Sequence, residues 1–267
     1  MRSTAFFEFD GVTTEDRAEP APILSLRNVG KSYGTVVALR QVDLDIAPGE
    51  LVAICGNNGA GKSSLAKIIS GAEDLTSGTM SLHGRQVRFS SPHDALEHGV
   101  ATIYQDLALA PRLSISANIF MGSELTRPLV IPFVRILDKK RMAAEARRHL
   151  AQLSVVMEDM STHVEQLSGG QRQVVAIARA LRWRAEIVVM DEPTASLGVK
   201  ESTVVLDLIR KLKEDGRTVL LVSHNMRDVA ALADRVVIME GGHKRLDRPV
   251  NGLAADDLAH LIVSGAE

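Results

Sequence analysis

The sequence is poor in three features that would each point to a particular class of protein. It holds a single cysteine, Cys55, among 267 residues, which excludes an intrachain disulfide framework and fits a reducing compartment. Aromatic residues make up only 3%, which leaves few side chains on which nucleic-acid bases could stack. The formal net charge of −2 provides no overall basic footprint. We therefore expect no nucleic-acid partner.

Long hydrophobic runs are also missing. No apolar stretch approaches the roughly 18 residues that predict a membrane-spanning helix. Residues 1–22 carry five acidic side chains and lack the basic start and apolar centre of a secretory signal, so they predict a flexible, solvated tail. A hydrophobic content of 45% with 24% charged residues is ordinary for a globular protein. The length predicts one large domain or two lobes that share a core.

The first third of the chain changes from alternating to continuous apolar patterns. Residues 23–26 and 42–46 alternate apolar and polar side chains, which predicts short strands with one wet face in an antiparallel lobe. Residues 51–55 are a continuous apolar run that ends in a glycine-rich loop, and residues 63–70 then follow helical periodicity. A buried strand, a loop and a helix in this order predict the opening unit of a parallel α/β sheet.

The rest of the chain continues this pattern after an interruption. Residues 138–152 predict a helix in a mainly helical middle segment, and prolines break the stretch before it. Helices and strands then alternate, with helices predicted at 171–183, 200–215 and 226–233 and strands at 187–190, 218–223 and 235–239. We therefore predict an α/β fold in which helices flank a parallel sheet and a helical segment is inserted between its halves.

The loop after the first buried strand fits the phosphate-loop pattern. It reads Gly-Asn-Asn-Gly-Ala-Gly-Lys-Ser over residues 56–63 and opens the following helix. Glycines let backbone N–H groups turn inward around phosphates, and the helix points its positive dipole end at them. Lys62 would neutralise charge between the β- and γ-phosphates, and Ser63 would offer a hydroxyl to Mg²⁺. A ligand-free glycine turn is the simpler alternative, which the strand and helix context disfavours.

Two carboxylates follow the strand predicted at 187–190. Asp191 suits Mg²⁺, and Glu192 suits the polarisation of an attacking water molecule. The carboxyl edge of an open parallel sheet is where such folds bind ligands. Adjacent acids after a strand are more often a solvated turn, but their pairing with a phosphate loop favours the catalytic interpretation.

A five-residue motif then indicates one particular protein family. Residues 167–171 read Leu-Ser-Gly-Gly-Gln directly before a predicted helix, which is the signature of the ATP-binding cassette family. The resemblance covers about 23–265, and the motifs come in the family's order. It implies an ATP-binding domain over 23–267 with a phosphate-loop NTPase core, an N-terminal antiparallel β lobe and a helical lobe inserted at about 106–170. In the family, the signature serine, here Ser168, faces the γ-phosphate bound by a second subunit.

Three further positions resemble family residues one by one. Tyr33 is similar to the aromatic residue that stacks on adenine. Gln105 resembles the glutamine that reports the γ-phosphate and Mg²⁺ to the helical lobe. His224 follows the strand predicted at 218–223 and resembles the switch histidine that holds the γ-phosphate and the attacking water. Taken alone, each has an ordinary structural explanation.

The resemblance therefore implies a complete site for ATP and Mg²⁺. The implied catalytic residues are Lys62, Gln105, Glu192 and His224, and the implied Mg²⁺ ligands are Ser63, Gln105 and Asp191. The implied nucleotide-binding residues are Tyr33, Gly56, Asn57, Asn58, Gly59, Ala60, Gly61, Lys62, Ser63, Ser64, Gln105, Ser168, Gly169, Gly170, Gln171 and Asp191. The other histidines form no compact ligand set, so we expect no further metal.

One position departs from the family pattern. Residue 198 is glycine, whereas many members carry aspartate there, so a contact across the subunit interface is not assigned to Gly198. The sequence Gly-Val-Lys-Glu at 198–201 is nevertheless familiar from cassettes of simple-sugar importers, as are the stretches 104–110 and 118–122. The chain stops soon after 261–265, which resembles the single-cassette form of the ribose, xylose or fructose type.

The function implied is that of an ATPase subunit that powers a membrane importer for a simple sugar. A head-to-tail dimer of cassettes would enclose two ATP molecules, close on binding and reopen on hydrolysis. The implied partners are a second cassette subunit, integral membrane permease subunits and, indirectly, a solute-binding protein. The chain would lie peripherally on the cytoplasmic face of the inner membrane.

Three other functions stay open at this point. The cassette could serve another nutrient importer or an exporter. A soluble cassette that acts on DNA or ribosomes would need long coiled-coil insertions or tandem cassettes, which are not present. A regulatory binder that does not hydrolyse ATP is disfavoured by the set Lys62, Asp191, Glu192 and His224, although Gly198 leaves it possible.

Overall fold

The main sheet of the molecule has six strands. The structure is a computed structural model that describes residues 21–128, 135–183 and 185–264, so the predicted tail lies almost wholly outside the described residues. In sheet order the strands are β12 (His243–Pro249), β11 (Arg235–Glu240), β3 (Leu51–Cys55), β10 (Thr218–Val222), β9 (Ile187–Asp191) and β6 (Val100–Ile103). All neighbours pair in parallel except β12, which runs antiparallel to β11 at one edge. The predicted parallel sheet is confirmed.

A second, antiparallel sheet is formed by the N-terminal part of the chain. Its order is β2 (Val36–Ile46), β1 (Leu24–Tyr33), β4 (Ser77–Leu82) and β5 (Arg85–Val87). The predicted antiparallel start is confirmed, but β1 and β2 are about twice as long as predicted. The added residues include exposed polar and apolar side chains that break the alternation, such as Val36, which is 64% exposed.

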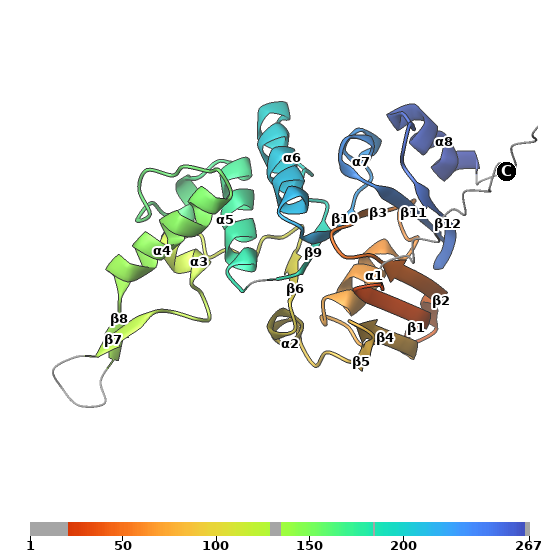
Figure 1. Ribbon diagram of the computed structural model, residues 1–267, viewed down its shortest axis with the longest axis horizontal. Coiled ribbons are helices and arrows are strands. Elements are labelled where there is room, and N and C mark those ends of the chain that lie inside the picture. Colours follow the sequence, from red (N-terminus) through yellow and green to blue (C-terminus); the bar gives the residue numbers. More distant parts are fainter. Residues whose placement is uncertain (1–20, 129–134, 184, 265–267) are drawn as a thin grey trace, which may run out of the picture.

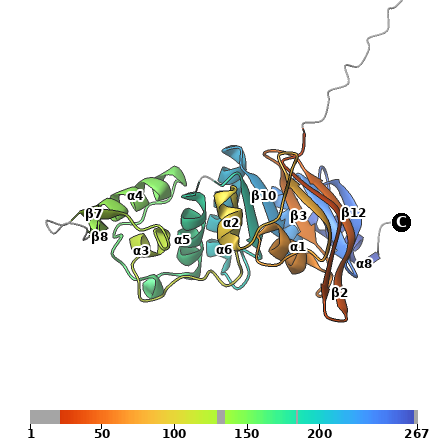
Figure 2. The same ribbon diagram turned by 90° about the horizontal axis from the view of Figure 1, so that it is seen from below.

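Helices cover both faces of the main sheet (Figures 1 and 2). Helix α1 (Lys62–Ile69) packs between the two sheets, where its Leu65 and Ile69 join the core with Val52 and Ile54 of β3. Helices α5 (Gly169–Leu181) and α6 (Val199–Glu214) lie on the other face, while α7 (Met226–Leu232) and α8 (Ala255–Ser264) cover the β11 end. The short α2 (Pro92–Glu97) precedes β6. The central strands β3, β10 and β9 thus bury both faces, which is why they are almost continuously apolar, whereas the edge strand β12 is largely polar.

The inserted segment, called the helical lobe below, comprises α3 (Ile115–Ile119), α4 (Lys139–Gln152) and the single 3₁₀ turn η1 (Val164–Gln166), together with a hairpin. Strands β7 (Thr126–Pro128) and β8 (Arg135–Leu137) form that hairpin, which projects from the lobe (Figure 1). We expected Pro128 only to interrupt helical structure. It ends an edge strand instead, a position at which the missing proline N–H costs no hydrogen bond.

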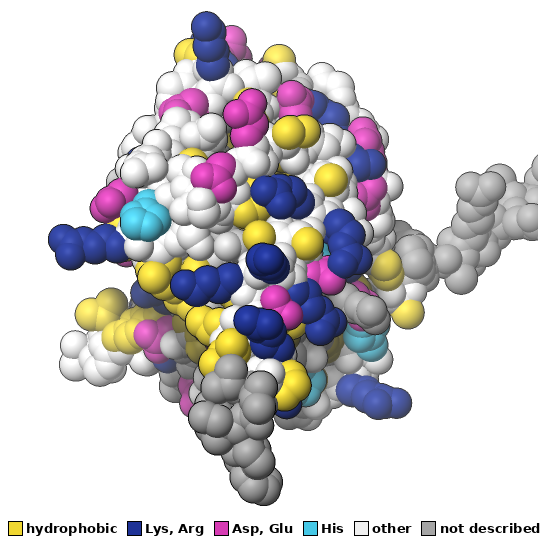
Figure 3. Space-filling model, turned by 90° about the vertical axis from the view of Figure 1, so that its left-hand side faces the viewer, with side chains coloured by type: hydrophobic (Ala, Val, Ile, Leu, Met, Phe, Trp, Pro, Cys, Tyr) yellow, Lys and Arg dark blue, Asp and Glu magenta, His cyan; other side chains and the backbone are white. Residues whose placement is uncertain are grey.

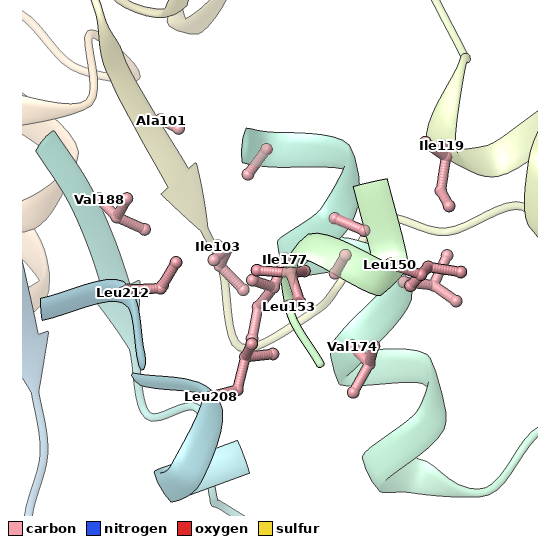
Figure 4. Packing of buried hydrophobic residues seen from close by; sticks show 14 of the residues in the cluster. Ala101, Ile103, Ile119, Leu150, Leu153, Val174, Ile177, Val188, Leu208 and Leu212 are labelled. Atoms are coloured by element: carbon pink, nitrogen blue, oxygen red, sulfur yellow. The ribbon is translucent and has the colours of Figure 1, made fainter. Parts of the chain in front are cut away.

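One continuous apolar core joins the helical lobe to the main sheet (Figure 4). Val188 of β9 and Ile103 of β6 face Leu208 and Leu212 of α6, and Ile177 of α5 lies beyond them. Leu150 of α4 and Ile119 of α3 extend the cluster into the lobe. This packing connects the sheet edge to the lobe without a break. No helix among the described residues has the length and apolar character that crossing a bilayer requires.

A buried asparagine holds the entry to the helical lobe. Asn118 is fully buried, and its Oδ1 accepts the backbone N–H of Ala110 at 2.7 Å. Its Nδ2 donates to the carbonyl oxygens of Ala110, Leu113 and Ser114 at 3.0–3.2 Å. The amide therefore closes the loop between β6 and α3, a role that no hydrophobic residue of similar size could take.

We predict that Asn118→Ala lowers the free energy of unfolding by about 2–4 kcal/mol, because it leaves several backbone groups of this loop unpaired in a buried place. Urea unfolding of the purified chain measures the change. The control is Asn251→Ala at an exposed turn, which should shift stability by no more than about 0.5 kcal/mol. Equal effects of the two substitutions would contradict this role.

Candidate nucleotide site

The carboxyl ends of the central strands lie in register along one edge of the sheet. Val222 of β10 pairs with Ile54 of β3 on one side and with Asp191 of β9 on the other. On the far side of β9, Ile103 of β6 pairs with Met190. The residues that follow these four strands are those singled out from the sequence: the loop at 56–61, Glu192, His224 and Gln105. The topology therefore gathers them at the edge where open parallel sheets bind ligands.

The loop after β3 has the backbone of an anion-binding turn. Gly56, Gly59 and Gly61 adopt φ values of 141°, 81° and 101°, which side chains strongly disfavour. A Cβ on Gly56 would lie 2.2 Å from the carbonyl oxygen of Met239, so only glycine fits there. Lys62 is 7% exposed, and its Nζ donates to the carbonyl oxygens of Gly56 and Asn57 at 2.8 and 3.0 Å. The ammonium group is thus curled over its own loop.

The strand that leads into this loop ends in Cys55, which is fully buried. Burial raises the pKa of the Cys55 thiol to about 12, although the nearby Lys62 ammonium acts against this shift. The side chain therefore stays a protonated, unreactive core group, as the sequence predicted.

Asp191 is held close to several charges. Its pKa lies above the ordinary value of 3.8, chiefly because it is half-buried and then because Glu192 carries a like charge beside it. Lys62 and Lys67 act in the opposite direction. The electrostatic coupling of Asp191 to Lys62 brings the acid pair and the phosphate loop into one site. Lys67 was not identified from the sequence, because a single lysine on a helix carries no motif.

Glu192 and His224 form a direct pair across two strand ends. The Nδ1 atom of His224 lies 2.8 Å from Oε1 of Glu192, with the carboxylate largely buried and the imidazole 65% exposed. The backbone N–H of Glu192 donates to the Val222 carbonyl at 2.9 Å, and its φ of 51° turns the side chain out of the strand direction. This backbone conformation is uncommon for residues other than glycine. The pair combines a carboxylate that can orient water with an imidazole that can exchange its partner.

Gln105 lies just beyond β6, exposed at the same edge. The following loop is fastened to the signature helix α5 by Arg179, whose guanidinium donates to the carbonyl oxygens of Leu107 and Ala108, both at 2.8 Å. Sequence reasoning missed Arg179, since an arginine inside an amphipathic helix looks like an ordinary surface residue.

Tyr33 ends β1, is 40% exposed and has the Lys31 ammonium 4.8 Å above its ring. The ring is thus partly exposed at the end of the antiparallel sheet, with a cation over one face.

The signature motif caps α5. The Ser168 hydroxyl accepts the Gln171 N–H at 3.4 Å, and the Gln171 side chain returns a bond to the Ser168 N–H at 2.9 Å. Glu201 of α6 reaches the same motif. Hydrogen bonds from the Ser168 hydroxyl and from the Gly198 and Gly170 N–H groups hold the pKa of the Glu201 carboxyl below its ordinary value. A Cβ on Gly170 would lie 3.0 Å from the Glu201 Cβ, so the motif's glycine admits this close approach.

The structure therefore brings together only part of the predicted set. The phosphate loop, Asp191, Glu192, His224 and Gln105 share the sheet edge. The signature motif starts α5, and α6 lies between α5 and α1 in both views (Figures 1 and 2). Gly198, the departure from the family pattern, donates its N–H to Glu201 at 3.3 Å and so helps to shape the signature region.

The fold and the sheet-edge residues define a protein of the phosphate-loop nucleotide-binding class. More specifically, the chain belongs to the ABC transporter family, whose model matches residues 39–195. As a member it is an ATP-binding subunit with ATPase activity. A solved dimeric ATP-binding cassette in a post-hydrolysis state, bound to ADP and Pi, superposes with a TM-score of 0.71 at 27% identity and covers 86% of this chain and 100% of its own.

Two curated relatives are similar over nearly their whole length. The chain is 46% identical over 225 residues to the fructose import ATP-binding protein FrcA of Rhizobium meliloti, which covers 84% of this chain and 86% of FrcA. It is also 46% identical over 220 residues to the xylose/arabinose import ATP-binding protein XylG of Sulfolobus acidocaldarius, covering 82% of this chain and 85% of XylG. The resemblance to simple-sugar importers is thereby confirmed.

We predict that Asp191→Asn raises the melting temperature of the nucleotide-free chain by about 1–3 °C at pH 8. The folded protein holds the Asp191 proton more tightly than the unfolded chain does, so ionisation of this group costs stability above its raised pKa. Differential scanning calorimetry from pH 8 downward should show the gain shrinking as the pH approaches the ordinary value of 3.8. Glu158→Gln, at an exposed site, is the matched control, and a lower melting temperature for Asp191→Asn at pH 8 would refute the account.

Proposed function

We propose that this chain is the ATP-hydrolysing subunit of a membrane importer for a simple sugar. The observation that carries the proposal is the Glu192–His224 pair, 2.8 Å apart, at the same sheet edge as the phosphate loop. The similarity to FrcA and XylG supports the choice of solute class, since both are named as import subunits for simple sugars.

ATP would bind with its phosphates on the loop at 56–63. Backbone N–H groups and the α1 N-terminus would hold the phosphate oxygens, while Lys62 would leave its loop carbonyls for the β- and γ-phosphates. Tyr33 would stack on the adenine. Ser64, one position further along α1, would add a polar contact beside the phosphates.

The residues at the loop end also fit Mg²⁺. Ser63, Asp191 and Gln105 offer only oxygen ligands of the kind that this ion prefers, and the raised pKa of Asp191 marks a carboxylate that an added cation would stabilise. When bound, Mg²⁺ neutralises charge on the phosphates. The chain's own contribution is to hold these oxygens at the edge of a rigid sheet.

Glu192 and His224 would serve the hydrolytic step. The Glu192 carboxylate would accept a hydrogen bond from the attacking water and align it with the γ-phosphate. His224 would exchange its contact with Glu192 for the γ-phosphate and so fix the water from the other side. Its exposed imidazole has room for this exchange, whereas the largely buried carboxylate stays in place.

Completion of the site would need a second copy of the chain. Ser168, Gly169 and Gly170 start a helix away from the phosphate loop of their own chain, so a head-to-tail, two-fold dimer would bring them to the γ-phosphate of the partner. The Glu201 carboxylate that now occupies this motif would have to yield to the phosphate. Hydrolysis would remove the bridging anion, and the dimer would reopen.

Movement of the halves would be transmitted through the helical lobe to permease subunits in the membrane. Arg179 fastens the loop after Gln105 to α5. This loop would therefore connect Gln105 at the sheet edge with the helix that carries the signature motif. The chain would therefore work peripherally at the cytoplasmic face of the membrane, with a solute-binding protein as its indirect partner.

Glu192→Gln should bind ATP but lower its turnover by about 100-fold or more, because the amide cannot act as the water-orienting base. Sedimentation with ATP and Mg²⁺ should show a stable dimer. Lys62→Ala is the comparison that lacks phosphate binding, and it should stay monomeric. Unchanged turnover in Glu192→Gln would remove Glu192 from the proposed role.

The proposed solute class is tested in the host. A strain that lacks this chain should lose growth on fructose, xylose or ribose as sole carbon source, and a plasmid copy should restore it whereas Glu192→Gln should not. Normal growth of the deleted strain on all three sugars, with a defect in the uptake or export of another compound, would overturn the sugar assignment but leave the ATPase assignment intact.

A further inference from the structure

A cavity of about 550 Å³ opens in the helical lobe, away from the sheet edge that carries the nucleotide site. It lies between α3, α4, β8 and the segment 159–163. None of its lining residues belongs to the site described above. Its walls combine two kinds of side chain, apolar and cationic.

The first kind is apolar. Leu113 and Leu137 are 44% and 48% exposed, two of the few large hydrophobic side chains so exposed among the described residues, and both line this cavity. Beneath them the floor is formed by buried Met142 and Met160 and half-buried Met121. Methionine is flexible and polarisable, so such a floor adapts to chains of varied shape.

The second kind is cationic. Arg112, Lys139 and Arg147 line the opening and are exposed. The adjoining hairpin and first turn of α4 add further cations: Arg127, Arg135, Lys140 and Arg141. Arg148 pairs with Glu145, whereas these other seven cations form no ion pair within the described ranges. Residues 112–148 hold eight basic and three acidic side chains, a net +5 within a chain of net −2.

Two acidic side chains, Asp159 and Glu124, also line the cavity, and both accept hydrogen bonds from neighbouring residues. Hydrogen bonds from the Ser161 hydroxyl and N–H, each 2.8 Å or shorter at its closest, hold the pKa of the Asp159 carboxyl below its ordinary value. Glu124 accepts the Gly122 N–H at 3.1 Å. Arg147 also acts electrostatically on Asp159, so these two acids offset part of the basic excess, and Arg112 and Lys139 of the lining keep no ion-pair partner in the described part of the chain.

We propose that this cavity and its cationic border bind an anionic phospholipid of the membrane surface. Arg112, Lys139 and Arg147 would hold the phosphate of the headgroup, and the start of an acyl chain would lie against Leu113, Leu137 and the methionine floor. Figure 3 shows this end of the molecule, where Lys and Arg side chains are interleaved with hydrophobic ones.

The mixed surface favours a lipid over a purely charged ligand. A soluble phosphate or an acidic peptide would need the cations but would leave Leu113 and Leu137 exposed to water. An anionic lipid satisfies both halves, since headgroup charge attracts clustered Lys and Arg while acyl carbons cover apolar side chains. The inference rests on the proposed function only in that it supposes a membrane nearby, and it does not depend on which solute is carried.

The test is flotation of the full-length chain with vesicles of phosphatidylcholine, with and without phosphatidylglycerol. We expect binding only where phosphatidylglycerol is present. The triple variant Arg112→Gln, Lys139→Gln, Arg147→Gln should weaken it about 100-fold, at roughly fivefold per basic residue near the surface. The control, Arg85→Gln, Arg210→Gln, Arg248→Gln, removes the same charge elsewhere and should keep full binding. The pair Leu113→Ser, Leu137→Ser should lose the binding that persists at high salt.

Several outcomes would overturn the proposal: no preference for phosphatidylglycerol, an equal loss in the control variant, or displacement of the chain from vesicles by excess inorganic phosphate. ATP turnover is measured beside flotation for every variant. Normal ATP turnover without vesicle binding would reject the lipid site and leave the proposed function standing. Vesicle binding without any ATP turnover would support the lipid site and reject the proposed ATPase function.

Discussion

The candidate site depends on one electrostatic arrangement, in which two adjacent carboxylates lie partly buried at the end of β9 beside the phosphate loop. Burial and the like charge of Glu192 raise the pKa of Asp191, and Lys62 and Lys67 act against that effect. The parallel strands supply these opposing charges, because β3 and β9 both pair in register with β10 and end at one edge. A cation bound beside Asp191 would favour its ionised form and so lower this raised pKa.

A second constraint follows from where the signature motif lies. Ser168 caps α5, and α6 lies between α5 and α1 in both views, so under the proposed function each chain contributes two half-sites that a second copy completes. Within the chain, Glu201 supplies the anion that the motif's N–H groups and hydroxyl attract. One buried core joins α5, α6 and the main sheet. Arg179 also fastens the loop after Gln105 to α5, so the proposed movement has a packed connection between the sheet edge and the signature motif.

Much of this could be predicted from the sequence, for reasons that differ between elements. Buried strands such as β3 and β9 are continuous apolar runs, so the strands were located, and their loops carry motifs that predict the nucleotide residues. Strand β12 was not predicted, because His243–Pro249 is mostly polar at an antiparallel edge. The β7–β8 hairpin was not predicted either, because prolines in this stretch were interpreted only as breaks. The contacts of Asn118, Arg179 and Glu201 were also missed. Arg179 and Glu201 join segments far apart in the chain, and Asn118 folds its amide back onto the loop just before it, so no spacing rule reveals these contacts.

The central claim is that two copies of the chain complete each ATP site, and the dependence of ATP turnover on protein concentration tests it most directly. With saturating ATP and Mg²⁺, turnover per mole of chain should rise with concentration and then level off as dimers form, and it should be absent from Lys62→Ala at every concentration. Turnover per mole that is constant down to the lowest concentrations, in a chain shown to be monomeric there, would contradict the account.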